Sequence, residues 1–160
     1  MRMKNRMKTI LDEIGAVFST QEPANEREMI TLIQRASTVV CAGAGRVGLN
    51  AAGFAKRLAH LGKTAFFVQD STLPKISEQD LLLIVSGSGE TPSLRLFADI
   101  AVEKGVPVGL ITSKEDSYIG RVADVTVQIQ CPSDEKTALG FTSEQPMTSL
   151  FEQVSHLYLD

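Results

Sequence analysis

Tryptophan is absent from the sequence, and aromatic residues make up only 6% of it. Aromatic-lined carbohydrate sites and platforms for single-stranded nucleic acids depend on exposed rings, so this scarcity argues against both. Positive charge is not in excess either, since 16 Lys and Arg residues face 19 Asp and Glu residues for a net charge of −3. We therefore expect neither a nucleic acid nor an anionic membrane surface as a partner.

Long apolar runs and closely spaced cysteines are also missing. The longest uninterrupted apolar run, residues 81–85, is far too short to span a bilayer. Residues 1–18 carry charges where a signal peptide needs a continuous apolar stretch. Cys41 and Cys131 lie far apart with no metal-ligand spacing around them, which favours reduced thiols. These features predict a cytoplasmic protein without a metal site.

What is present is the pattern of one α/β domain over residues 1–160. Apolar residues at helical spacing predict N-terminal helices within 1–36, where Asn25 resembles an N-cap with Glu28 as its capping-box partner. These helices would pack on the domain or on a partner subunit. Short apolar and β-branched runs then predict five strands, at 38–42, 64–68, 80–85, 106–112 and 125–129.

Helical segments are predicted between these strands, over 49–61, over 93–104 and near Ser117, and a last helix is predicted from Pro146 onward. The run at 80–85 is continuous in apolar residues rather than alternating, which is typical of a central parallel strand. The fold class that follows is a three-layer, doubly wound α/β sandwich around a five-stranded parallel sheet.

Two loops at predicted strand ends favour anion binding, because ligands of open α/β sheets bind beyond the carboxyl ends of the strands. The glycine loop, residues 43–48, has G-x-G-x-x-G spacing and carries Arg46. Its alternative interpretation is a tight turn without a ligand. The hydroxyl loop, residues 86–91, has three hydroxyls and two glycines just before a predicted helix. One hydroxyl would suffice for a helix cap, so we interpret this loop as a phosphate site.

A nicotinamide-binding fold is an alternative for the glycine loop. Asp70 lies near the end of the second predicted strand, where such a fold places an acidic residue. However, Asp70 also fits a turn, and two adjacent anion-binding loops fit one small sugar phosphate better than a dinucleotide.

The two loops and several further segments resemble the sugar isomerase (SIS) domain family, and within it the 6-phospho-3-hexuloisomerase branch. The matching segments follow one another along nearly the whole chain: 43–46, 57–62, 85–91, 111–113, 123–124 and 145–153. The hydroxyl loop is typical of the whole family, whereas residues 145–153 are more specific to the hexuloisomerase branch.

The resemblance implies a flavodoxin-like fold, usually assembled as a homotetramer or dimer with sites at subunit interfaces. It implies an isomerase of carbohydrate metabolism, as in the ribulose monophosphate pathway. This enzyme would interconvert D-arabino-hex-3-ulose 6-phosphate and fructose 6-phosphate through an enediol, without a cofactor or metal. The residues implied in phosphate binding are Ser86, Gly87, Ser88, Gly89 and Thr91.

Further site residues follow from the same resemblance. Gly45 and Arg46 would contact the substrate, and Glu152 would be the acid/base group. His60 matches a family position and is a second acid/base candidate. On the residues alone, Glu152 also fits a surface glutamate near a helix start, and His60 a partner of a helix C-terminus.

The chain departs from the family pattern at three points. Val47 stands where the family usually has Ser, and Thr148 replaces a common Gly. The family also continues past the position of Asp160, with a C-terminal segment that closes over a neighbouring subunit's site, so we expect either a naturally short form or a chain without that segment. A non-catalytic SIS module that binds a phosphosugar is the second functional hypothesis.

Overall fold

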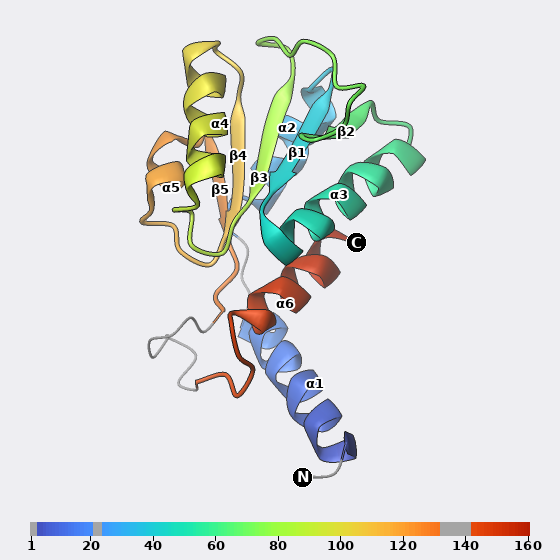
Figure 1. The fold of residues 1–160 in the computed structure, drawn as a ribbon, viewed down its shortest axis with the longest axis vertical. Coiled ribbons are helices and arrows are strands. Elements are labelled where there is room, and N and C mark those ends of the chain that lie inside the picture. Colours follow the sequence, from blue (N-terminus) through green and yellow to red (C-terminus); the bar gives the residue numbers. More distant parts are fainter. Residues whose placement is uncertain (1–2, 21–23, 132–141) are drawn as a thin grey trace.

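The computed structural model describes residues 3–20, 24–131 and 142–160. Its centre is a sheet of five strands in the order β2-β1-β3-β4-β5, with every neighbouring pair parallel (Figure 1). The strands are β1 (Val39–Gly43), β2 (Ala65–Phe67), β3 (Leu81–Val85), β4 (Val108–Thr112) and β5 (Val125–Gln128). The predicted five-stranded parallel sheet is therefore confirmed, and its strand order is flavodoxin-like.

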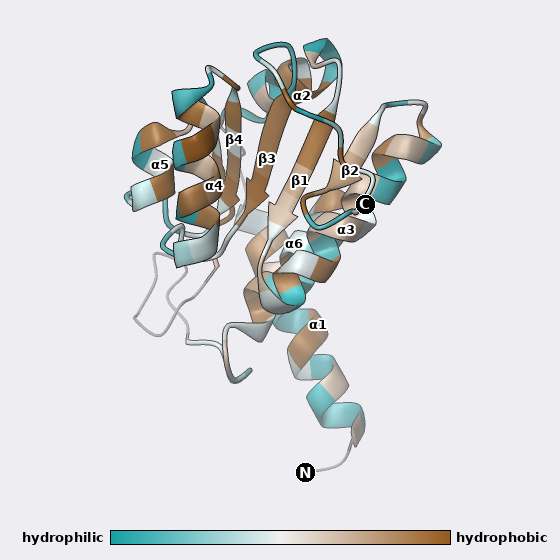
Figure 2. Cartoon of the chain, turned by 45° about the horizontal axis from the view of Figure 1, so that its top comes forward, coloured by the Kyte–Doolittle hydropathy of each residue, from teal (hydrophilic) through white to brown (hydrophobic). Residues whose placement is uncertain are grey.

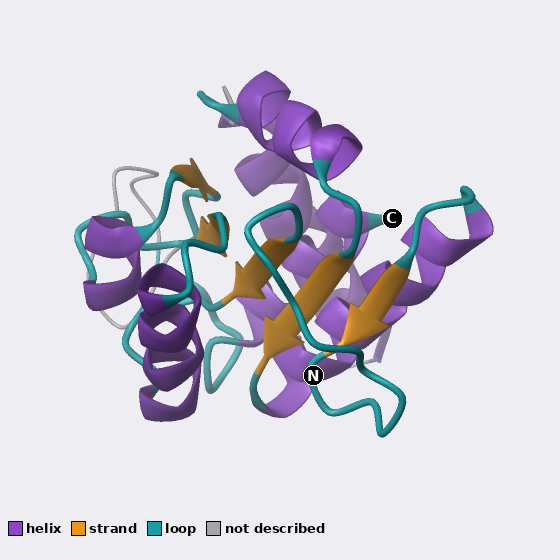
Figure 3. Ribbon diagram, turned by 90° about the horizontal axis from the view of Figure 1, so that it is seen from above, coloured by secondary structure: helices purple, strands orange, loops and turns teal. Residues whose placement is uncertain are grey.

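Helices cover both faces of this sheet, as Figure 3 shows from above. They are α1 (Met3–Thr20), α2 (Glu26–Arg35), α3 (Gly45–His60), α4 (Pro92–Glu103), α5 (Tyr118–Val122) and α6 (Ser149–Leu159). Residues of α4 and α5 share one apolar core with the sheet, whereas residues of α1, α2, α3 and α6 share the other. The three-layer, doubly wound sandwich is thereby confirmed.

The two cores arise from the two-residue period of the strands. In β1, Val39 and Cys41 belong to the core under α3 and α6, while Val40 and Ala42 belong to the core under α4. All five residues of β1 and all five of β3 are buried, and these strands are strongly apolar in Figure 2. Burial raises the pKa of Cys41 to about 12, so this thiol stays protonated at neutral pH. Its side chain packs in the apolar core.

Three local predictions are wrong. Asn25 occupies the N-cap position of α2, but its side chain makes no capping bond, and its amide donates instead to the carbonyl of Thr126, 3.1 Å away. The helix predicted from residue 49 already begins at Gly45, so most of the glycine loop is helical. The last helix begins at Ser149 rather than Pro146, whose carbonyl accepts from the Ser149 amide.

Helix α1 extends away from the sheet beyond α6 (Figure 1). Its second half contacts the domain through the buried residues Glu13 and Val17, while Met3, Met7 and Leu11 are exposed. No helix among the described residues is long and apolar enough to cross a membrane.

Candidate active site

The two predicted loops meet at a cavity of about 410 Å³ at the carboxyl ends of β1, β3 and β4. Parallel strands bring their carboxyl ends to one edge of the sheet, so loops distant in sequence become neighbours there. The cavity is lined by Ala44, Gly45, Arg46, Val47, Val85, Ser86, Gly87, Ser88, Thr91, Leu94, Ser113, Lys114, Thr148, Phe151 and Glu152.

The hydroxyl loop presents its hydroxyls as donors to this cavity. Ser86 Oγ accepts a hydrogen bond from the Gly89 amide at 3.2 Å, and Ser88 Oγ accepts from the Glu90 amide at 3.1 Å. Each oxygen accepts from the loop's own backbone, which leaves its proton for an acceptor in the cavity. Thr91 is the N-cap residue of α4, yet its side chain makes no capping bond within that helix. The loop is therefore suited to an anion.

An ion pair lies at another part of the cavity wall. Arg46 Nη1, in the first turn of α3, is 2.8 Å from Glu152 Oε2, in the first turn of α6. The Glu152 side chain is only 15% exposed, and apart from this ion pair its buried Oε2 accepts no hydrogen bond within the described residues. The cavity thus combines an anion cradle with a largely buried carboxylate.

Close packing brings α6, and with it Glu152, onto the hydroxyl loop. A Cβ atom at Gly87 would lie 3.1 Å from Cδ1 of Phe151, so the absence of a side chain there lets the two segments touch. Asn50 of α3 holds the same turn of α6, since its amide donates to the Glu152 carbonyl at 2.6 Å and to Ser155 Oγ at 3.1 Å. The turn of α6 that carries Glu152 is therefore held both by the hydroxyl loop and by α3.

Most of the predicted site residues come together in this cavity. Gly45, Arg46, Ser86, Gly87, Ser88, Thr91 and Glu152 all line it. Gly89 does not line it and instead turns the loop. His60 lies at the end of α3 and lines a separate hollow of about 330 Å³, together with His156. In its own chain His60 is thus not part of the cavity that holds Glu152.

Two cavity residues were missed by the sequence analysis. Ser113 and Lys114 follow β4, and Ser113 Oγ donates to the Gly87 carbonyl at 2.7 Å. Their place directly after the fourth strand was the signal that could have found them, because that strand also ends at the ligand edge of the sheet. Lys114 adds a second cation to a cavity that already holds Arg46.

The nicotinamide alternative loses its support. The carboxylate of Asp70 accepts from the Phe67 amide at 2.8 Å, so it closes a local turn. The glycines of the glycine loop also have a packing role, since a Cβ at Gly43 would lie 2.9 Å from the Val47 carbonyl, and one at Gly48 equally close to the Gly43 carbonyl. Strand β1 and helix α3 need these glycines to approach each other.

A hydroxyl- and glycine-rich loop suited to an anion, beside a largely buried carboxylate at the ligand edge of a flavodoxin-like sheet, is typical of α/β proteins that bind small anionic molecules. The sequence profile of the SIS domain matches residues 32–155, and the chain belongs to the SIS domain family. The resemblance found in the sequence is confirmed.

Relatives of nearly full length agree with this assignment. The chain is 35% identical to a 3-hexulose-6-phosphate isomerase of Bacillus subtilis over 100% of this chain and 86% of the relative. It is 36% identical to a 3-hexulose-6-phosphate isomerase of Mycobacterium gastri over 94% of this chain and 75% of the relative. With these relatives, membership of the family identifies the chain as an enzyme, an isomerase.

A solved structure shares the fold closely. It is a protein of Methanococcus jannaschii for which a molecular function of 3-hexulose-6-phosphate isomerase has been inferred, with a TM-score of 0.80 and 26% identity. The match covers 98% of this chain and 85% of that chain.

Proposed function

We propose that the protein interconverts D-arabino-hex-3-ulose 6-phosphate and fructose 6-phosphate. The observation that carries this proposal is the Glu152 carboxylate, which lies in the same cavity as the hydroxyl loop, is largely buried, and has at Oε2 the ion pair with Arg46 but no hydrogen bond from the described residues. A 6-phosphorylated sugar anchored at that loop would offer the rest of its carbon chain to this carboxylate. The names of the full-length relatives support the same substrate.

The hydroxyl loop binds the phosphate in this proposal. Ser86, Ser88 and Thr91 donate their hydroxyl protons to the phosphate oxygens, and the backbone at Gly87 allows a close approach. The start of α4 lies at the end of this loop, where the positive end of the helix dipole favours an anion. Lys114 contributes positive charge at the cavity wall.

Glu152 moves the proton. The carboxylate removes the proton from carbon 2, next to the carbonyl at carbon 3, and the electron pair forms the double bond of an enediolate between these carbons. The same carboxyl group returns the proton to carbon 3, while the hydroxyl proton of oxygen 2 ends on oxygen 3. Arg46 lies beside Glu152 and supplies positive charge to the enediolate oxygens. Val47 offers an apolar side chain where the family usually has a hydroxyl.

A homo-oligomer is part of the same proposal. Because His60 lies outside the cavity of its own chain, an acid/base role for it requires a second copy. The exposed side chains of Met3, Met7 and Leu11 on α1 supply an apolar surface for such an assembly.

Replacement of Glu152 by Gln tests the reaction and the base together. Ribulose 5-phosphate and formaldehyde are supplied with a hexulose-phosphate synthase, and fructose 6-phosphate is detected. We expect steady production by the wild type and a kcat about 10²–10⁴-fold lower in Glu152→Gln, because the isosteric amide cannot take up the proton. Binding of fructose 6-phosphate to the variant should persist.

The matched control is Glu103→Gln, which removes an exposed carboxylate at the end of α4, away from the cavity. Undiminished turnover in Glu152→Gln would refute the assignment of the base. A wild type that binds fructose 6-phosphate without producing it would instead identify a non-catalytic phosphosugar-binding module.

A further inference from the structure

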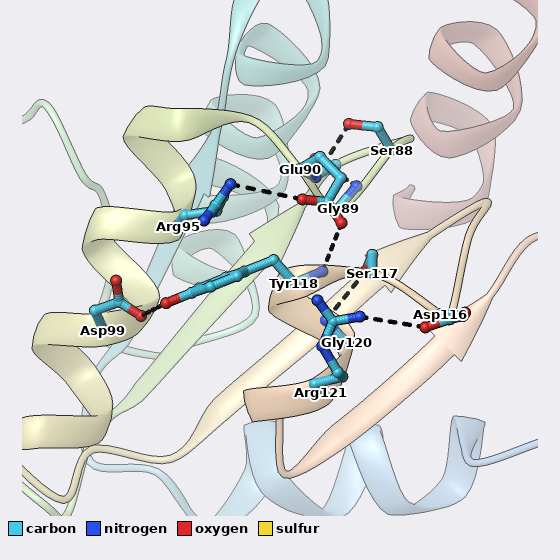
Figure 4. Close-up of polar contacts among 11 residues, drawn as sticks. Ser88, Gly89, Glu90, Arg95, Asp99, Asp116, Ser117, Tyr118, Gly120 and Arg121 are labelled. Carbon is cyan, nitrogen blue, oxygen red and sulfur yellow. Dashed lines mark hydrogen bonds and ion pairs between the residues drawn. The ribbon is translucent and has the colours of Figure 1, made fainter.

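Glu90 belongs to the hydroxyl loop, but its carboxylate is turned away from the cavity. The neighbouring loop residues Ser88 and Thr91 line the cavity, whereas Glu90 does not. Figure 4 shows its side chain between the loop and the first turn of α5. A negative charge aimed at a bound phosphate would oppose binding, so a carboxylate at this position needs another task.

The carboxylate connects the loop to two helices. Oε1 of Glu90 accepts a hydrogen bond from the backbone amide of Tyr118 at 2.8 Å, and Oε2 lies 3.8 Å from Nη1 of Arg95 (Figure 4). Arg95 in turn stacks on the Tyr118 ring, 3.9 Å from its centre, and the Tyr118 hydroxyl donates to Asp99 at 3.0 Å. Glu90 is therefore part of a chain of contacts between α4 and α5.

The backbone beside Glu90 is pressed against the same turn of α5. Gly89 has a φ of +64°, and a Cβ there would lie 2.1 Å from Ser117 Oγ. The Gly89 carbonyl accepts from the Ile119 amide at 3.1 Å. Ser117 is fully buried, and its Oγ accepts from the Gly120 amide at 3.2 Å, so this turn is a fixed support for the loop.

The opposite side of the same short backbone segment holds the cavity hydroxyls. Ser88 Oγ accepts from the amide of Glu90 itself, at 3.1 Å, and Ser86 Oγ accepts from the amide of Gly89, at 3.2 Å. A shift of residues 89 and 90 away from α5 would therefore displace both serine oxygens. The contact of Glu90 with Tyr118 thus bears directly on the geometry of the phosphate donors.

We propose that Glu90 is a positioning residue of the hydroxyl loop, which sets Ser86 and Ser88 for the phosphate through its bond to the Tyr118 amide. This inference rests on the proposed function for the identity of the substrate, though not for the presence of an anion in the loop. The bond, rather than the charge, is the active feature, because the Glu90 and Arg95 side chains are 42% and 40% exposed and their ion pair is weak.

The test compares Glu90→Ala with Glu90→Gln. Loss of the hydrogen bond in Glu90→Ala should raise both the KM for fructose 6-phosphate and the inhibition constant of inorganic phosphate by about three- to tenfold, with kcat unchanged. Glu90→Gln keeps a carbonyl oxygen for the Tyr118 amide and should restore both constants to within about twofold of the wild type. Asp116→Ala is the matched control, since it breaks the exposed pair of Asp116 with Arg121 beside α5 and leaves the bond of Glu90 to Tyr118 in place.

Two outcomes would overturn the proposal. A lower melting temperature in Glu90→Ala with unaltered KM and phosphate inhibition would reduce Glu90 to a stabilising surface residue. Tighter phosphate binding by Glu90→Gln than by the wild type would show that its charge matters more than its bond.

Calorimetric titration of each variant with inorganic phosphate and with fructose 6-phosphate gives a readout that needs no turnover. If the wild type has no isomerase activity but Glu90→Ala still binds both anions more weakly than the wild type, the proposed function fails and the role of Glu90 stands. If the titrations show equal affinities for the wild type and Glu90→Ala, the role of Glu90 fails whatever the reaction.

Discussion

Thr148 and its neighbour Met147 both have left-handed backbone conformations just before α6, with φ values of 59° and 57°. A β-branched residue is strained there, because its branched side chain crowds the following carbonyl group. Thr148 also lines the cavity, and α6 follows directly with Glu152 in its first turn. The strain is thus stored at the entry of the helix that carries the proposed base.

Thr148→Gly should raise the free energy of unfolding by about 0.5–1 kcal/mol. Glycine removes the strain of the left-handed conformation, and its larger freedom in the unfolded chain offsets part of the gain. Urea denaturation measures the difference. Ser149→Gly is the control and should destabilise the protein, because it removes a helix former and the 2.7 Å bond from Ser149 Oγ to the Pro146 carbonyl. A Thr148→Gly protein less stable than the wild type would contradict the account.

Cavity residues in the two loops could be predicted where the residue types themselves indicate anion binding. The surplus of hydroxyls at 86–91 and the arginine in the glycine loop led to cavity residues. The direction of a side chain was not predictable in the same way. Glu90 lies in the same loop, yet it bonds to α5, which is 28 residues further along the chain.

The elements around the site are joined by a buried carboxylate. Glu13 of α1 is 7% exposed and accepts hydrogen bonds from Ser143 Oγ at 2.7 Å, the Glu144 amide at 2.8 Å and Gln145 Nε2 at 2.9 Å. Burial acts to raise the pKa of Glu13, but these hydrogen bonds outweigh it and hold the pKa below its ordinary value of 4.5. Helix α1 is thereby fastened to the segment that leads into α6.

A lowered pKa makes this contact a source of stability that depends on pH. The contribution of Glu13 is complete above the unfolded-state value of 4.5 and is lost as the pH falls through the lower folded-state pKa. Asp80, whose pKa is also lowered despite its burial, by hydrogen bonds from Ser77 and Thr38, acts in the same direction. The difference in the free energy of unfolding between the wild type and Glu13→Gln, measured as a function of pH, therefore isolates the contribution of Glu13 from that of Asp80.

Glu13→Gln should lower the free energy of unfolding at pH 7 by about 1–3 kcal/mol, since the amide cannot satisfy the donors around it. The deficit should shrink below pH 4.5, where the wild type loses the same bonds. Denaturation curves between pH 3 and 7 measure both effects. Asp12→Asn, at an exposed position on the same helix, should leave the curves almost unchanged. A deficit that does not vary with pH would contradict the assignment.

The type and order of the elements were predictable, whereas several boundaries were not. Continuous apolar runs such as that of β3 identify buried parallel strands, because both faces of the sheet are covered. The start of α3 was missed by four residues, since its first turn contains two glycines, Gly45 and Gly48, which normally disfavour a helix. Tertiary packing against β1 requires the second of them, and local sequence preference does not reveal that.

At the scale of the whole molecule, the helices on the two faces of the sheet contribute different parts of the site. Helices α4 and α5 close one core and support the hydroxyl loop from behind. Helices α3 and α6 close the other core and carry the Arg46–Glu152 pair. The first half of α1 adds an arm with exposed apolar side chains, since Met3 is 78%, Met7 56% and Leu11 65% exposed.

This arm is the surface by which we expect copies of the chain to associate. Leu11→Glu places a charge at the end of this exposed apolar surface, at a side chain that is 65% exposed in its own chain, so the fold should survive. Sedimentation velocity should show a multimer for the wild type and a mass at least halved for the variant at the same micromolar concentration. Leu96→Glu, at an exposed leucine of α4 on the opposite face of the sheet, is the matched control. Because charge burial opposes association, the variant should re-associate only at much higher protein concentration. A monomeric wild type, or a Leu11→Glu protein with the wild-type mass, would exclude α1 as the contact between copies.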